Sequence, residues 1–324
     1  MIFVTGGTGF IGAHLLMHLA EEGQQIRAFK RGSSSTAFFE KLLDFYGKPH
    51  LSSRIEWHDG SLDDVPGLVA ALEGCDTVYH CAGKVSFAEK DWPELLKTNR
   101  DTTANLVNAS IEAGSTTFCL FSSVAALDMS LGIKGKKTDW KAFRKHQPYG
   151  YSKYLGELEV YRGHEEGLNV VVLNPAVVIG ASDETNPLSR FVARMRRGMK
   201  FYPSGSTGFV SVELLCRLAI DATRNASGQT RITVCSDNLG FKTMMEKFSA
   251  AAGTAPPKQE IKGGLFFAAY LAAWIIRFVG IRSELSVSGL RAMSSQSSYD
   301  TAPSENYKAF SLDKAIQEAV SFTA

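Results

Sequence analysis

The first twelve residues constrain the fold of this chain more than any other stretch. A short apolar run at Ile2 to Val4 leads into the motif Thr5-Gly6-Gly7-Thr8-Gly9-Phe10-Ile11-Gly12, which a helical pattern follows. Gly6 would let the chain turn sharply off a strand, Gly9 would let a pyrophosphate approach the backbone, and Gly12 would let the helix pack on the sheet. The free N–H groups at the helix start would bind the phosphates. The motif therefore predicts a nucleotide site, with a plain surface turn as the alternative.

Short apolar runs and helical patterns alternate along most of the chain. The expected strands are residues 1–5, 25–29, 55–58, 76–83, 118–123, 170–173 and 231–234, and the expected helices include 11–22, 95–113 and 149–163. Such alternation indicates an α/β fold with a doubly wound parallel sheet. Ligands bind to folds of this kind at the carboxyl ends of the strands, so we expect the site there.

Two basic residues follow the second expected strand. In a dinucleotide fold this strand end faces the adenosine ribose, where an acidic side chain would bind the 2′-hydroxyl. The sequence has Lys30 and Arg31 at this place, and a basic pair suits a 2′-phosphate. NADP is therefore favoured over NAD, with a solvated basic turn as the alternative.

A tyrosine and a lysine one helical turn apart give the strongest catalytic signal. Tyr149 and Lys153 lie at positions i and i+4 and so share a helix face. The lysine cation would favour the phenolate and lower the pKa of Tyr149 toward the range of a general acid and base. Ser122 and Ser123 end the fifth expected strand, at the same sheet edge, where a hydroxyl would stabilise charge on a substrate oxygen. Serines at strand ends also serve simply as turn formers.

These motifs, taken in order, resemble those of the short-chain dehydrogenase/reductase superfamily in its extended branch. The segments that carry the resemblance are 5–12, 80–83, 99, 121–123, 149–153 and 174–180. The resemblance implies a Rossmann-type NAD(P)-binding core over residues 1–175, with a returning strand near 230–235. It also implies a smaller C-terminal lobe over 176–324 that mainly binds substrate.

The resemblance assigns roles to individual residues. Tyr149 would be the general acid and base, and Lys153 would bind the nicotinamide ribose. Ser123, or else Ser122, would hold the substrate oxygen, and Asn99 completes the catalytic set. Ser61 stands where many members have Asp, so that cofactor contact would fall to the backbone at Leu62. The implied cofactor-binding residues are Gly6, Thr8, Gly9, Phe10, Ile11, Gly12, Lys30, Arg31, Ser61, Leu62, Ala82, Gly83, Lys153, Pro175, Val177 and Val178.

Within this branch the chain looks most like dihydroflavonol reductase and hydroxysteroid dehydrogenase-like reductases. We therefore expect an NADP-dependent carbonyl reductase or alcohol dehydrogenase acting on a small, apolar or aromatic substrate, with NAD as the other cofactor choice. Nucleotide-sugar dehydratases carry an acidic residue after the fifth strand, and Ser123-Val124-Ala125 has none. An NAD(P)-dependent nucleotide-sugar epimerase is the first alternative. The second is a non-catalytic NADP(H)-binding sensor or scaffold, against which the intact Ser-Tyr-Lys set counts.

Charge and cysteine content narrow the partners and the compartment. A net charge of +2 and a pI near 8.2 argue against nucleic acid as a partner. The cysteines are scattered and odd in number, which is typical of free thiols in a reducing compartment. With no leader ahead of the first strand, we expect a cytoplasmic protein. His14 and His18 share a helix face without a third ligand in sight, so we expect no metal.

Three further segments carry expectations about surfaces. Residues 128–147 are a long basic stretch that indicates a solvated flap, with closure over substrate as the alternative. The apolar run 265–276 is shorter than the ~20 residues of a membrane-spanning helix, so we expect a packed helix or pocket wall, with membrane-surface docking as the alternative. Helices 95–113 and 149–163 correspond to those that pair in dimers of the family, which by analogy suggests a homodimer.

Overall fold

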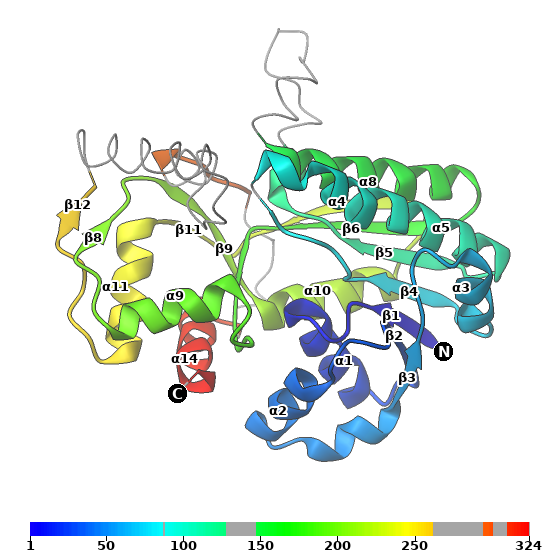
Figure 1. Cartoon of the computed structure of the whole chain (residues 1–324), viewed down its shortest axis with the longest axis horizontal. Helices are drawn as coiled ribbons and strands as arrows, with labels where there is room; N and C mark the ends of the chain where they lie inside the picture. Colours follow the sequence, from blue (N-terminus) through cyan, green and yellow to red (C-terminus); the bar gives the residue numbers. More distant parts are fainter. Residues whose placement is uncertain (87, 128–146, 262–293, 301–309, 324) are drawn as a thin grey trace, which may run out of the picture.

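The computed structural model describes residues 1–86, 88–127, 147–261, 294–300 and 310–323 (Figure 1). The expected flap lies outside these residues except for Gln147, and the apolar run 265–276 lies outside them entirely. Among the described residues, no helix is both long and apolar enough to cross a bilayer. The five cysteines are free thiols, of which Cys81 is half-buried and the others are buried.

Seven parallel strands of the described chain form one sheet, in the order β10-β6-β5-β4-β1-β2-β3. This order confirms the predicted doubly wound α/β fold, because the strands run outward from β1 in both directions. The expected strands also coincide with observed ones to within three residues at each end. The strands are β1 (Ile2–Thr5), β2 (Ile26–Lys30), β3 (Ile55–Asp59), β4 (Thr77–His80), β5 (Thr117–Phe121), β6 (Asn169–Pro175) and β10 (Gln229–Val234).

Helices cover both faces of this sheet (Figure 1). On one face lie α1 (Phe10–Glu21), α2 (Ala37–Phe45) and α10 (Val212–Arg224), and on the other lie α3 (Val65–Leu72), α5 (Thr102–Glu112) and α8 (Pro148–Glu165). Short 3₁₀ turns connect some elements: η1 (Pro49–Arg54), η2 (Glu89–Asp91) and η4 (Val124–Ala126). Local capping fixes two helix starts, since Asp64 accepts a hydrogen bond from Gly67 N and Ser211 accepts one from Leu214 N.

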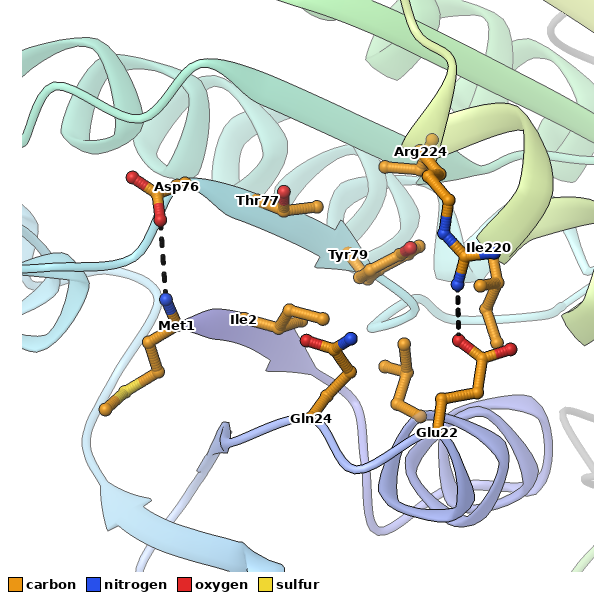
Figure 2. Close-up of a pocket in the computed structure, with 11 residues that line it drawn as sticks. Met1, Ile2, Glu22, Gln24, Asp76, Thr77, Tyr79, Ile220 and Arg224 are labelled. Atoms are coloured by element: carbon orange, nitrogen blue, oxygen red, sulfur yellow. Dashed lines mark hydrogen bonds and ion pairs between the residues drawn. The ribbon is translucent and has the colours of Figure 1, made fainter.

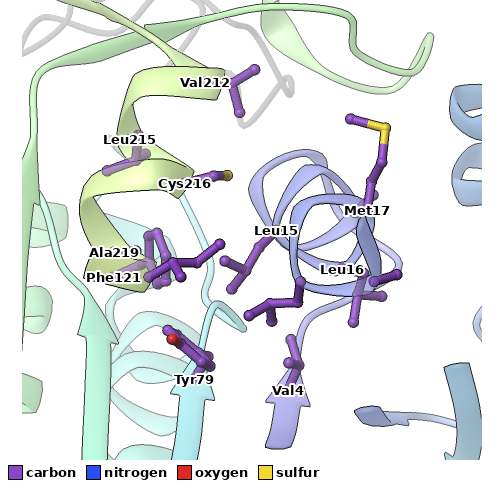
Figure 3. Packing of buried hydrophobic residues seen from close by; sticks show 14 of the residues in the cluster. Val4, Leu15, Leu16, Met17, Tyr79, Phe121, Val212, Leu215, Cys216 and Ala219 are labelled. Carbon is purple, nitrogen blue, oxygen red and sulfur yellow. The ribbon is translucent and has the colours of Figure 1, made fainter. Parts of the chain in front are cut away.

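The strands are apolar on both sides, as central strands of a parallel sheet must be. Consecutive residues alternate between two cores: Val4 and Tyr79 pack toward α1 and α10, whereas Phe3 and Val78 pack toward α3 and α5. Figure 3 shows Leu15 of α1 between the sheet and α10 in the first of these cores. Both cores hold the strand ends rigidly, which positions the loops that follow them.

The expected helix 95–113 is interrupted. The structure has α4 (Trp92–Leu96), one π-helical turn η3 (Lys97–Asp101) and then α5. The π turn contains Asn99, whose side chain bonds to the backbone of Lys84 and to Ser152. These tertiary bonds account for the local departure from α geometry, which periodicity alone does not reveal.

A second group of elements packs beside the sheet (Figure 1). Its own strands are β7 (Val177–Ile179), β9 (Ser206–Ser211) and β11 (Asp237–Gly240), with a separate pair β8 (Phe201–Tyr202) and β12 (Gln259–Glu260). Its helices α9 (Pro187–Arg196), α11 (Phe241–Ala252) and α14 (Leu312–Phe322) share one apolar cluster. Although both follow residue 176, β10 is a strand of the large sheet and α10 packs against that sheet. The division of the chain near residue 175 stays a prediction.

Candidate active site

The glycine turn lies at the carboxyl end of β1. Gly6 has φ 72°, a left-handed conformation that L side chains rarely adopt, and a Cβ there would lie 2.5 Å from the backbone nitrogen of Ala82. A Cβ on Gly12 would lie 2.2 Å from the carbonyl oxygen of Gly6. Gly9 is the N-cap residue of α1, and no side chain caps the first amides of this helix. The amides at the start of α1 can therefore hold a phosphate, which fits a dinucleotide.

The loops after β1 and β4 meet at the point where the strand order reverses. Gly6 touches Ala82, and Ala82 N donates to Thr5 Oγ1 at 3.4 Å. A Cβ on Gly83 would come within 3.2 Å of Asn99 Oδ1 and 3.5 Å of Lys153 Nζ. This is where doubly wound folds bind their ligands. The turn, the exit of β4 and the side chains of Asn99 and Lys153 are therefore close neighbours.

Asn99 is almost fully buried, and its side chain hydrogen-bonds to the backbone of Lys84. Its Oδ1 accepts from Lys84 N at 2.8 Å, and its Nδ2 donates to Lys84 O at 2.9 Å and to Ser152 Oγ at 2.8 Å. The amide therefore ties the loop after Gly83 to α8. This geometry gives Asn99 a positioning role.

Tyr149 and Lys153 lie in the first two turns of α8 and come together there with Ser123, which follows the carboxyl end of β5. Tyr149 and Ser123 share a hydrogen bond, and Ser123 Oγ accepts from Ala125 N at 3.1 Å. Lys153 Nζ donates to the carbonyl oxygen of Phe121 at 2.6 Å. The amide of Ala125 occupies one lone pair of the Ser123 oxygen, so the hydroxyl keeps its one proton to donate, either to Tyr149 or to a substrate oxygen.

The pKa of Tyr149 is shifted in the direction opposite to the one expected. Burial raises the pKa of the Tyr149 phenol, and the hydrogen bond with Ser123 acts against that rise. The predicted lowering of the Tyr149 pKa by Lys153 is therefore not what the structure shows, because desolvation dominates and the ammonium group lies at Phe121 O. Burial lowers the pKa of Lys153 to about 8, and the charge of Glu157 acts to raise it. At neutral pH the phenol is protonated and the amine is mostly charged.

The two candidate serines face different surroundings. Ser122 is buried and donates its hydroxyl to Glu157 Oε1, whereas Ser123 is half-buried and lies with Tyr149. Consecutive residues of extended chain point to opposite sides, which explains the difference. Sequence reasoning missed Glu157, although its position four residues after Lys153 on the same helix was a signal.

At the end of β2, where we expect the adenosine ribose, the two predicted basic residues have different surroundings. Lys30 Nζ pairs with Asp59, its register partner at the end of β3, and only 13% of its side chain is exposed. Arg31 is exposed at the start of a turn closed by Ser34 N donating to Arg31 O at 2.8 Å. Sequence reasoning missed Asp59, because the pairing depends on sheet register.

The remaining predicted cofactor residues line the same edge. Ser61 Oγ accepts from Asp63 N at 3.1 Å, and Leu62 O accepts from Asn105 Nδ2 at 2.9 Å, so both belong to a fixed loop after β3. Pro175 ends β6, while Val177 and Val178 begin the second sheet. Thr8, Phe10 and Ile11 lie in the glycine turn and the first turn of α1.

A hollow among the described residues lies at the opposite, amino edge of the sheet. It measures about 220 Å³ and is lined by Met1, Asp76, Tyr79 and Arg224 among others (Figure 2). Ion pairs of the Met1 amine with Asp76 and of Glu22 with Arg224 border it. Its lining includes none of the predicted site residues.

The two histidines of α1 have separate partners. A hydrogen bond of 2.8 Å joins His14 Nε2 to Ala181 O, and another of 3.1 Å joins His18 Nδ1 to Glu21. Among the described residues, no group of three or more His, Cys, Asp or Glu side chains could hold a metal.

Comparison with known proteins defines the class. The model of the NAD dependent epimerase/dehydratase family matches residues 2–211, so the chain belongs to that family, within the extended short-chain dehydrogenases/reductases. Its relatives are reductases, dehydrogenases and epimerases, and the chain is an NAD(P)-dependent oxidoreductase that acts on a small molecule.

Individual relatives show how far the similarity extends. A Synechocystis sp. protein provisionally named dihydroflavonol 4-reductase is 27% identical over 333 residues, covering 98% of this chain and 88% of its own. Sterol demethylase protein B of Methylococcus capsulatus is 29% identical over 261 residues, covering 80% and 76%. UDP-glucose 4-epimerase of Bifidobacterium longum, solved with NAD⁺ and UDP, shares the fold with a TM-score of 0.72 at 18% identity, covering 99% and 97%.

Proposed function

We propose that the chain is an NADP-dependent carbonyl reductase or alcohol dehydrogenase with a Ser123-Tyr149-Lys153 site. The observation that carries the proposal is the hydrogen-bonded pair of Tyr149 and Ser123, one helical turn from a buried lysine. The nicotinamide would supply or accept the hydride when bound. The protonated Tyr149 phenol would donate its proton to the substrate oxygen, and the Ser123 hydroxyl would stabilise that oxygen as charge develops.

The cofactor preference rests on Arg31. Because Asp59 neutralises Lys30, the exposed guanidinium of Arg31 is the cation left to meet a 2′-phosphate. A hydrogen bond to a charged group contributes about 1.5–3 kcal/mol. We therefore expect Arg31→Ala to lower kcat/KM for NADPH by roughly 10- to 100-fold and to leave the value for NADH nearly unchanged. Equal losses with both cofactors would contradict NADP selectivity.

The substrate class rests on apolar exposure near the site. Val85, two residues after Gly83, is 60% exposed, and Val177 is 44% exposed. Exposed apolar side chains beside a polar site suit an apolar or aromatic carbonyl compound. Two relatives described above are named as a dihydroflavonol 4-reductase and a sterol demethylase protein, and these names are in line with such substrates.

The decisive experiment follows NADPH and NADH oxidation over a panel of aldehydes, ketones and aromatic carbonyls. Tyr149→Phe should lower turnover by about 10²- to 10⁴-fold, the usual contribution of a general acid. Tyr151→Phe is the matched control, since Tyr151 stacks on Trp92 at 5.4 Å and should keep turnover within a few-fold. Full turnover in Tyr149→Phe would refute the assignment.

The epimerase alternative draws support from the family model and from the likeness to UDP-glucose 4-epimerase. It would be favoured by NAD that copurifies with the chain and by interconversion of a UDP-sugar without net oxidation of cofactor. Tight NADPH binding without turnover of any substrate would favour the sensor or scaffold.

A further inference from the structure

Glu157 carries a fully buried carboxylate behind the candidate site. Its side chain is 0% exposed, and three donors reach it: Ser122 Oγ, Asn174 Nδ2 at 2.7 Å and Arg231 Nη2 at 2.7 Å. A buried charge is tolerated only when it is paired and its lone pairs are satisfied. This network meets both conditions, because Arg231 pairs with the carboxylate and both carboxylate oxygens accept hydrogen bonds.

The network joins elements that are far apart in the sequence. Arg231 comes from β10, Asn174 from β6 and Glu157 from α8, and Arg231 Nε also donates to Asn174 Oδ1 at 3.0 Å. Asn174 Nδ2 donates in addition to the carbonyl oxygen of Ser123 at 2.9 Å. The carboxylate therefore fixes, through one amide, the backbone of the residue proposed to hold the substrate oxygen.

Glu157 also acts on the charge of Lys153. The two residues lie one turn apart on the same face of α8, and Lys153 is 6% exposed. Burial alone lowers the pKa of Lys153, and Glu157 is the strongest influence that raises it. The ammonium is also faced by His80 at the end of β4 and by Cys81, which follows it, with Arg231 beyond Glu157.

Cys81 and His80 supply no negative charge near neutral pH. Burial raises the pKa of the Cys81 thiol well above its ordinary value, and burial lowers the pKa of His80 to about 3. Both are neutral near pH 7. Of the described groups that act on Lys153, the Glu157 carboxylate is thus the source of the opposing charge.

We propose that Glu157 is a positioning residue of this active site, which holds the Ser122–Ser123 segment through Asn174 and keeps Lys153 an ammonium ion. This inference rests on the proposed function. Arg231 limits the effect of Glu157 on Lys153, because the guanidinium pairs with the same carboxylate and offsets part of its charge. The arrangement predicts opposite consequences for removing the carboxylate and for removing the guanidinium.

The test titrates Lys153 directly by NMR in protein labelled with ¹³C-lysine, the signal being assigned by its loss in Lys153→Met. We expect Glu157→Gln, which keeps the shape but loses the charge, to move the titration of Lys153 to lower pH by at least about one unit. Glu157→Asp, which keeps the charge but shortens the side chain, should titrate close to wild type. Arg231→Gln should move the titration to higher pH.

Each outcome of the titration either supports the proposed role of Glu157 or overturns it. An unchanged titration in Glu157→Gln would overturn the inference, because a purely structural carboxylate would alter stability but not Lys153. Should Glu157→Gln fail to fold, the direction of the shift in Arg231→Gln decides in its place. As the pH rises, the NADPH affinity of Glu157→Gln should fall at a lower pH than that of wild type. The NMR titration needs neither substrate nor turnover, so failure of the reductase proposal would appear separately, as absent carbonyl reduction by wild type.

Discussion

Replacing Gly12 by alanine should destabilise the chain, although the same change inside most helices stabilises them by about 1 kcal/mol. The new Cβ would lie 2.2 Å from the oxygen and 2.7 Å from the carbon of the Gly6 carbonyl, and 3.0 Å from Gly7 Cα. All three atoms are backbone and cannot rotate away. Overpacking costs roughly 1–3 kcal/mol, and a backbone clash belongs at the upper end. The net expectation is a loss of about 2 kcal/mol.

Gly9→Ala is the matched control. Gly9 has φ −97°, which alanine adopts readily, and the nearest atom to its Cβ would be Gly6 O at 3.4 Å. Alanine is a poorer helix cap than glycine but restricts the unfolded chain, and the two effects nearly cancel. We expect stability to stay within about 0.5 kcal/mol of wild type. NADPH affinity should nevertheless fall on the order of tenfold, because a Cβ keeps the pyrophosphate from the backbone.

The assay is thermal unfolding without cofactor, followed by circular dichroism, together with the Kd for NADPH from fluorescence titration. At roughly 2 °C per kcal/mol for a chain of this size, Gly12→Ala should melt about 4 °C below wild type. A Tm equal to or above that of wild type would refute the steric argument. Unchanged NADPH affinity in Gly9→Ala would refute the placement of the phosphates at this turn.

Three further predictions concern charge and chemistry. Asp59→Asn should free the Lys30 ammonium and raise the ratio of kcat/KM for NADPH over NADH several-fold, and an unchanged ratio would contradict this. Burial lowers the pKa of His14 to about 3 in the folded chain, so stability should fall as pH drops from 6.5 toward 3, by up to about 1.4 kcal/mol per unit. His14→Gln should flatten that slope in melts taken across pH, and parallel curves would count against it. Ser123→Ala should lower kcat by about 10²- to 10³-fold while the Kd for NADPH stays within about twofold, a split that a merely structural serine would not produce.

The large sheet could be predicted because its signals are local. An apolar run such as Val170 to Leu173 indicates a buried parallel strand, and the glycine spacing fixes a turn of one shape. The second sheet gives no comparable signal. Its strand β7 has three residues and pairs with β9, which in turn pairs with β11, so the sheet is built from separate parts of the chain. The π turn at Asn99 is likewise set by bonds to Lys84 and Ser152, which no periodicity encodes.

The site shows the same division between local and tertiary information. The spacing of Tyr149 and Lys153 predicts a shared helix face because it is a property of one helix. The direction of the Tyr149 pKa depends instead on burial, which spacing does not measure.

The charge available at the predicted cofactor edge also depends on tertiary contacts. Lys30 and Arg31 are equivalent in the sequence, but Asp59 lies opposite Lys30 across β2 and β3 and neutralises it. A basic pair in the sequence is therefore a single exposed cation in the fold. Under the proposed function, the choice between NADPH and NADH would then depend on the balance of one guanidinium and one carboxylate. Arg31→Ala and Asp59→Asn should consequently move the cofactor ratio in opposite directions, a pair of signs that a merely solvated basic turn would not give.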